Sequence, residues 1–285
     1  MLRNTFIFLH ILFLISCSSG AGTESTGMRT SEISGSDKKV CILLADLEDG
    51  ILFKAGSNFC RETSPVMYAF QPVLALAALE TGTWKDPQGS YPWDKTKYPY
   101  IRWQKDQNLR SSLDHSVVWY FQKIWNDTGA LKLKTWLSKV GLPTDLPSDP
   151  NRVFWMDGGY VWTPEEFFSF LWKFFSKDLE IRPKNRSAVL EGLSRNPGEI
   201  RNPSGIHFIR GSWGNAKEFY SDSGTGYGAG RSVSWYWFLW KKERKTFLFL
   251  SKVESASETL PPLEAAEFGT NYLRENGLWE KYFSD

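Results

Sequence analysis

The side chains that could do chemistry are few in this sequence. The clearest nucleophile and base pair is Ser36-Asp37-Lys38-Lys39, in which a lysine follows a serine by three residues. On a helix this spacing places a base beside the hydroxyl, which is a poor nucleophile until its proton is removed. This pair lies in polar sequence ahead of the first apolar segment, so we interpret it as part of a solvated linker.

Histidines and metal ligands give no better candidate. Beyond the N-terminal segment the histidines are His115 and His207, and no serine–histidine–aspartate arrangement stands out. His115 directly precedes Ser116, but neighbours on a helix point apart, so a surface or packed histidine is favoured. The spacing typical of metal ligands is absent, and we expect neither a metal nor a cofactor.

The N-terminal residues have the pattern of an export signal. Arg3 supplies a positive charge, and residues 5–15, "TFIFLHILFLI", form an apolar run too short for a strong membrane span. The following "LISC" resembles a bacterial lipoprotein signal, which implies loss of residues 1–16 and lipid attachment at Cys17. An ordinary signal peptide with a chance cysteine is the alternative. Residues 17–38 are rich in Ser, Gly and Thr and predict a flexible tether.

Export would place the folded part in an oxidising compartment of the bacterial cell envelope, periplasmic or at the surface. Cys41 and Cys60 could pair there, because a hairpin between them would bring them together. A buried thiol at Cys41 and an isolated Cys60 are the alternative, since two cysteines do not fix the geometry. The net charge of +2 gives no reason to propose nucleic acid as a partner.

The rest of the chain predicts strands at both ends and helices between them. Residues 39–56 read as strand, turn and strand around Asp49-Gly50, and residues 68–81 read as an apolar helix. Residues 84–105 form a loop rich in Trp, Tyr, Pro and Lys, and residues 108–141 show two helical patterns.

Later segments complete this plan. Thr163 can cap a helix that has Pro164 in its first turn, and residues 232–240, "SVSWYWFLW", predict an interior strand. A partner strand and a closing helix follow. We therefore predict one α+β domain over residues 39–285, an antiparallel sheet flanked by helices, with an all-helical insertion at about 84–205.

Four segments carry a resemblance to a known family. They are "LETG" at 79–82, "WQKDQNLRSSLDHSVVWYFQKI" at 103–124, "FWMDGGYVWTPEE" at 154–166 and "DSGTGYGAGRSVSW" at 222–235. In this order they resemble serine β-lactamases and penicillin-binding transpeptidases, most closely the class D β-lactamases. The resemblance implies that fold and a cleft lined by Ser116, Val118, Trp155, Ser223, Gly224 and Thr225.

The residues that do the family's chemistry are missing. Counting back from "LETG" puts Tyr68 where the nucleophilic serine belongs and Gln71 where the base lysine belongs, and Asp222 aligns with the K-T-G lysine. Glutamine cannot titrate, and an aspartate repels a substrate carboxylate. Loss of the nucleophile alone costs on the order of 10⁶ in rate. We predict a non-catalytic member of the family, with Tyr68 filling the place of the serine.

Two other functions stay open. An enzyme with altered chemistry, acting on β-lactams, would use Tyr68 or Ser116. A module that binds peptidoglycan or an envelope protein would use exposed Trp and Tyr side chains of residues 84–103, although packing of a long loop accounts for most of them. A β-lactam sensor is disfavoured, because a sensor of that kind needs the acylating serine.

Overall fold

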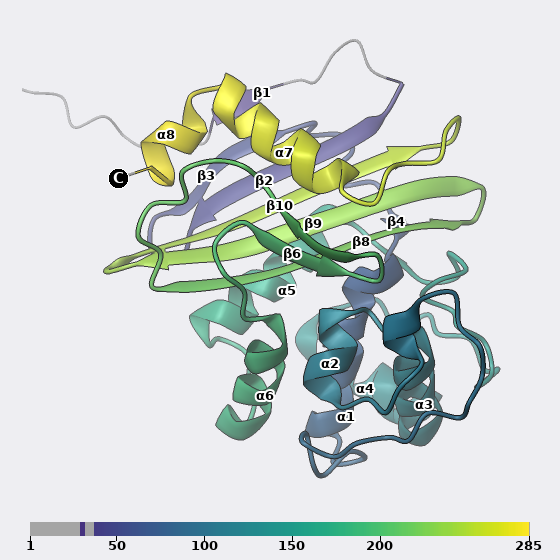
Figure 1. The fold of residues 1–285 in the computed structure, drawn as a ribbon. Coiled ribbons are helices and arrows are strands. Elements are labelled where there is room, and N and C mark those ends of the chain that lie inside the picture. The colour runs from purple at the N-terminus through teal and green to yellow at the C-terminus, as the bar shows by residue number, and fades with distance from the viewer. Residues whose placement is uncertain (1–28, 32–36, 285) are drawn as a thin grey trace, which may run out of the picture.

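Helices cover both faces of a six-stranded sheet in this computed structural model, which describes residues 29–31 and 37–284 (Figure 1). The strand order is β1-β3-β2-β10-β9-β8, antiparallel except for the β1–β3 pair. The strands of this sheet are β1 Arg29–Ser31, β2 Lys39–Asp46, β3 Gly50–Ala55, β8 Glu218–Gly228, β9 Arg231–Lys242 and β10 Lys245–Ser255. This architecture confirms the predicted α+β fold.

The other elements lie on the two faces of the sheet. Two short pairs are formed by β4 Ser64–Pro65 with β5 Val161–Trp162, and by β6 Glu199–Asn202 with β7 Gly205–Phe208. The helices are α1 Gln71–Glu80, α2 Leu109–Asp114, α3 Val118–Thr128, α4 Ala130–Val140, α5 Pro164–Ser176, α6 Pro183–Leu193, α7 Glu264–Glu275 and α8 Leu278–Tyr282, with 3₁₀ turns η1 Met67–Phe70 and η2 Ile101–Trp103. Helices α7 and α8 lie on one face, and α1 to α6 lie on the other (Figure 1).

Strand β9 separates two apolar cores. Trp235 and Trp237 pack in the core below the helical segment, whereas Tyr236 and Phe238 pack in the core under α7 and α8. Successive side chains of a strand point to opposite faces, so a strand covered on both faces must be apolar throughout. The predicted interior strand at residues 232–240 is therefore present as β9.

Helix α1 is buried on all sides. Every residue from Gln71 to Leu79 is buried, which explains why its Ala- and Leu-rich sequence shows no polar face. The helix begins later than the predicted residue 68. The preceding turn, η1, is a 3₁₀ helix, and Pro72 in the first turn of α1 has no amide hydrogen to extend an α-helix backwards.

Two further segments differ from the sequence prediction. Residues 108–141 form three helices instead of two, because the first predicted helix is interrupted between Asp114 and Val118. Within the predicted tether, Arg29–Ser31 form β1 and pair in parallel with Phe53–Ala55. The predicted signal peptide, Cys17 and most of the tether lie outside the described residues.

Two local features hold the segments around η1. Cys41 of β2 and Cys60 are joined by a disulfide, which ties the sheet to the turn that precedes β4. Thr163 caps α5 in a capping box: its side chain accepts from the Glu166 amide at 3.1 Å, and the Glu166 carboxylate accepts from the Thr163 amide at 2.7 Å.

Candidate functional site

The η1 turn places Tyr68 against strand β8. Phe70, two residues on, anchors the turn in an aromatic cluster, with ring centroids 4.9 Å from Tyr160 and 5.5 Å from Phe154. Tyr68 itself is half-buried. Burial, with a smaller contribution from Tyr100, raises the pKa of Tyr68 to about 12. The phenol is therefore neutral near pH 7, and a neutral phenol is a weak nucleophile.

Gln71 lies at the start of α1 and is 2% exposed. Its side-chain amide donates to the carbonyl of Ser116 at 3.4 Å, so it ties α1 to the break between α2 and α3. Trp155 is fully buried, and its indole N–H has no partner among the described residues.

Ser116 lies in the break between α2 and α3, with a positive φ of 48°. The expectation that His115 and Ser116 are neighbours on a helix is therefore wrong, although no hydrogen bond joins the two side chains among the described residues. Burial, and then Arg102, lowers the pKa of His115 to about 4, and its Nδ1 has no partner among the described residues. Val118 begins α3 and is partly buried.

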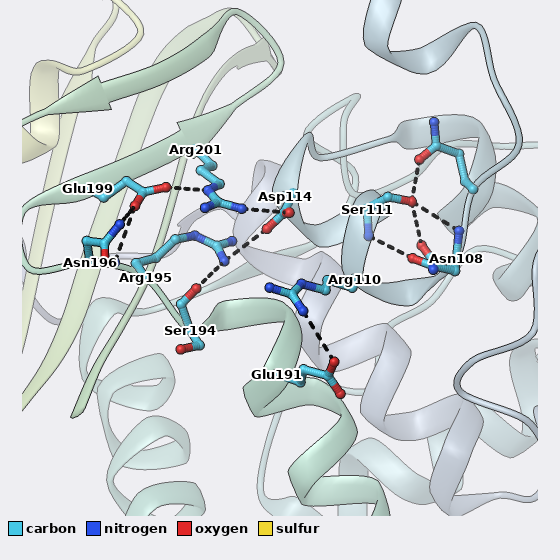
Figure 2. A network of polar contacts seen from close by, with 11 residues as sticks. Asn108, Arg110, Ser111, Asp114, Glu191, Ser194, Arg195, Asn196, Glu199 and Arg201 are labelled. Atoms are coloured by element: carbon cyan, nitrogen blue, oxygen red, sulfur yellow. Dashed lines mark hydrogen bonds and ion pairs between the residues drawn. The ribbon is translucent and has the colours of Figure 1, made fainter. Parts of the chain in front are cut away.

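Asp222, which the sequence resemblance aligns with the K-T-G lysine, is 7% exposed. Burial raises the pKa of Asp222 to about 7, while the guanidinium of Arg195 acts in the opposite direction. Arg195 pairs with Asp114 at 3.0 Å, and Arg201 pairs with the other oxygen of Asp114 at 2.8 Å (Figure 2). A positive charge is thus present near this position, but it is supplied by Arg195 and is engaged with Asp114.

The Arg195–Asp114–Arg201 network extends to Glu199, which pairs with Arg201 and accepts from the Asn196 side chain at 2.7 Å (Figure 2). It joins α2, the segment after α6 and β6. Sequence reasoning missed the network, because its members are far apart in the chain and follow no motif. The one available signal was Asp114, which lies two residues before Ser116.

A row of glycines on β8 faces η1. A Cβ atom added to Gly224 would lie 2.4 Å from the Cβ of Tyr68, and one added to Gly226 would lie 2.8 Å from the Met67 sulfur. A Cβ added to Gly228 would lie 2.9 Å from the Met67 methyl and 2.7 Å from the Gly158 amide nitrogen. Met67 and Tyr68 therefore occupy the space directly over this edge strand.

The neighbouring residues of β8 face the other way. Thr225 donates to the Pro262 carbonyl at 3.1 Å and bonds the hydroxyl of Ser234 at 2.7 Å. Ser234 in turn accepts from the Ala265 amide of α7. Because side chains alternate along a strand, Thr225 and Ser223 lie on the α7 face. The expectation that these two side chains line the cleft is wrong, whereas Gly224 lies on the cleft side.

Several aromatic side chains in the loop of residues 84–105 are fixed by hydrogen bonds that their N–H or O–H groups donate. The Trp103 indole donates to the His115 carbonyl at 2.8 Å, and Trp103 is 5% exposed. The Tyr98 hydroxyl donates to Asp94 at 3.1 Å. Trp93 is half-buried, and its indole donates to the Thr96 carbonyl at 2.9 Å. These contacts agree with packing as the main role of the loop aromatics.

Residues 29–31 and 37–284 contain no cluster of three or more His, Cys, Asp or Glu side chains able to hold a metal ion. Within the same residues, no helix is long and apolar enough to cross a membrane.

Comparison with known families gives a partial match over the helical half of the site. The family described as "Penicillin binding protein transpeptidase domain" matches residues 69–155, a range that begins one residue after Tyr68. Among curated relatives, regulatory protein BlaR1 of Bacillus licheniformis is 32% identical over 119 residues, 42% of this chain and 20% of that protein. Probable beta-lactamase YbxI of Bacillus subtilis (strain 168) is 22% identical over 236 residues, 83% of this chain and 80% of that protein.

Solved structures cover more of the chain. The C-terminal domain of the Bacillus licheniformis BlaR penicillin-receptor has a TM-score of 0.70 at 21% identity, covering 85% of this chain and 92% of that one. The class D beta-lactamase YbXI from Nostoc also has a TM-score of 0.70, at 19% identity, with coverages of 85% and 95%. The described sheet and helices therefore have the fold of these proteins, whereas the sequence match spans only a fifth of BlaR1.

Proposed function

This chain belongs to the class D β-lactamase-like family, and on that premise we propose that it is a non-catalytic member that does not acylate. The observation that carries the proposal is the filled space over β8. Met67 and Tyr68 stand directly against Gly224, Gly226 and Gly228 of this strand.

The chemistry of the site supports the same proposal. Acyl transfer needs a nucleophile, a base and a positive charge for the substrate carboxylate. Tyr68 is a neutral phenol, Gln71 does not titrate, and Asp222 replaces the lysine that would draw a carboxylate. Ser116 is no substitute nucleophile, because it is 1% exposed and its neighbour Gln71 is not a base.

Incubation of the purified protein with a fluorescent penicillin tests the proposal. We expect no covalent labelling after denaturing electrophoresis, under conditions in which an active class D β-lactamase is labelled. Covalent labelling of the unmodified chain would contradict it. The double change Tyr68→Ser with Gln71→Lys is the informative companion, since labelling of this variant would show that η1 has the register of the catalytic serine.

The proposed location is the cell envelope, with a lipid at Cys17. The "LISC" sequence ahead of polar residues supports this part of the proposal. We expect the full-length chain to incorporate labelled palmitate and to sediment with membranes, and a Cys17→Ser variant to do neither. Equal membrane association of both forms would argue against a lipid anchor.

Peptidoglycan or an envelope protein is the proposed partner class for the aromatic loop. Trp93 favours it: the ring is half-exposed, is held by its bond to Thr96 and has the Lys95 ammonium 4.8 Å from its centroid. Trp93→Ala should reduce retention on purified peptidoglycan at unchanged thermal stability. Trp103→Ala is the control for unfolding, because Trp103 is buried.

A further inference from the structure

A second cavity lies away from the β8 cleft, under the far end of the sheet from η1. It has a volume of about 810 Å³ and lies between α5, α6 and the strand ends near the β9–β10 turn. Cavities of about 300–1,000 Å³ are typical of small-molecule sites. Helices α5 and α6 can be seen side by side beneath the sheet (Figure 1).

The walls of this cavity are largely apolar. Phe175 packs edge-on to Trp237 with ring centroids 5.7 Å apart and lies 5.9 Å from the Tyr220 ring, so the wall is rigid. Leu179, Leu190 and Leu239 complete it. Such a surface suits the apolar body of a ligand.

Arg186 of α6 supplies a buried positive charge to the same cavity. The residue is 9% exposed, and its guanidinium lies 5.0 Å from the Phe174 ring centroid. It donates to the carbonyls of Phe174 and Leu179 but makes no ion pair with a carboxylate of the described residues. Burial lowers the pKa of Arg186, while the charge of Glu80 acts in the opposite direction. A buried cation that is not paired with a carboxylate is costly.

The charged residues of the lining are three cations, Lys177, Arg186 and Lys241, and three carboxylates, Glu48, Glu180 and Glu218. Lys241 pairs with Glu218 at 2.5 Å, and Glu180 pairs with Lys139, which lies outside the lining. Two of the three carboxylates are thus paired with lysines and not with Arg186. The guanidinium has five N–H donors, and two carbonyls do not exhaust them.

We propose that this cavity binds a small amphipathic anion. The carboxylate or sulfonate head would lie at Arg186, and the apolar tail would lie along Phe175, Leu179 and Leu190. This site is separate from the β8 cleft and does not depend on whether that cleft has lost its chemistry.

Calorimetric titration of the full chain with decanoate tests the proposal, with decanol as the uncharged match. We expect saturable binding of one decanoate per chain, and at least about ten-fold weaker binding of decanol, since one lost ion pair of about 1.4 kcal/mol changes affinity ten-fold. Ser187→Asp adds a negative charge to the cavity lining and should weaken decanoate binding by a similar factor. Ser138→Asp, the same change at an exposed helical serine outside the cavity, should not.

Arg186→Gln should abolish binding if the variant keeps its circular dichroism spectrum. Arg186 also donates to backbone carbonyls at the end of α5, so this variant can fail to fold. In that case the comparison of Ser187→Asp with Ser138→Asp tests the proposal. Equal binding of decanoate and decanol, equal binding by the two serine variants, or no saturable binding of decanoate would each overturn the proposal.

Discussion

Three glycines at alternate positions of β8 allow the close contact between this strand and η1. Gly224, Gly226 and Gly228 leave room for Met67 and Tyr68, because side chains two residues apart share one face of a strand. In the sequence these glycines belong to the segment that resembles the K-T-G motif, and they do not predict which side chains pack over them. The filling of the cleft could not be predicted, since it depends on how closely η1 approaches the strand.

Gly224→Ala tests this close approach. The new Cβ would lie 2.4 Å from the Cβ of Tyr68, and overpacking of this kind costs about 1–3 kcal/mol. We expect the free energy of unfolding in urea to fall by that amount, and to fall by much less when the same change is made in a Tyr68→Gly background. An equal cost in both backgrounds would show that Tyr68 does not occupy the space over Gly224.

Asp222 makes stability depend on pH. Burial raises the pKa of Asp222 to about 7 in the folded protein, above the value of about 3.9 expected for an unfolded chain. Between these two values the folded state holds more protons, so this group's contribution to stability falls as pH rises from about 4 to about 7. Asp222→Asn should be more stable than the unmodified chain at pH 8, and the gain should shrink towards pH 4.

Urea unfolding at several pH values measures this difference. Asp145→Asn, the same change at an exposed aspartate, is the control. A constant difference between Asp222→Asn and the unmodified protein from pH 4 to pH 8 would count against a raised pKa.

At the scale of elements, helix starts and buried strands could be predicted from caps and apolar patterns, whereas the interruption between α2 and α3 could not. Thr163 and Pro164 marked the start of α5 correctly, because capping depends on residues within one turn. The interior position of β9 followed from its unbroken apolar run. The interruption at His115–Val117 did not, because Ser116 adopts a positive φ that no glycine in the sequence signals.

The capping box of α5 gives a prediction at this scale. Thr163→Ala removes the acceptor for the Glu166 amide and should lower the free energy of unfolding by about 1 kcal/mol. Thr135→Ala is the matched control, because Thr135 is exposed within α4 and bonds only the Leu131 carbonyl. Its effect should be close to zero or stabilising, since alanine is the better helix former. A larger cost at Thr135 would contradict this reasoning.

At the scale of the whole molecule, the disulfide links the sheet to the segment that carries η1. The cysteines are 19 residues apart in the chain, and a closed loop of about this length stabilises by about 3 kcal/mol in the chain-entropy view. The double change Cys41→Ala with Cys60→Ala should therefore lower the free energy of unfolding by about that amount. Reductant should destabilise the unmodified protein similarly and leave the double variant unchanged, and a response of both proteins would rule out this bond as the cause.

The α+β fold could be predicted from the order of strands and helices and from four family segments. The pairing of Cys41 with Cys60 could not, since it requires the distance between β2 and the turn before β4. The Arg195–Asp114–Arg201 network was beyond prediction for the same reason: its charges meet only after α2, α6 and β6 have assembled. The sequence therefore predicts which catalytic residue types are absent, and the structure shows which side chains lie at the positions concerned.

Strand β1 also sets how far the domain can stand from a membrane. With Arg29–Ser31 paired to β3, the link from a lipid at Cys17 to the folded part is the eleven residues 18–28, about half of the tether expected from the sequence. A fully extended chain of that length spans roughly 40 Å. If Cys17 carries the anchor, the sheet edge at β1 cannot rise further than this above the bilayer.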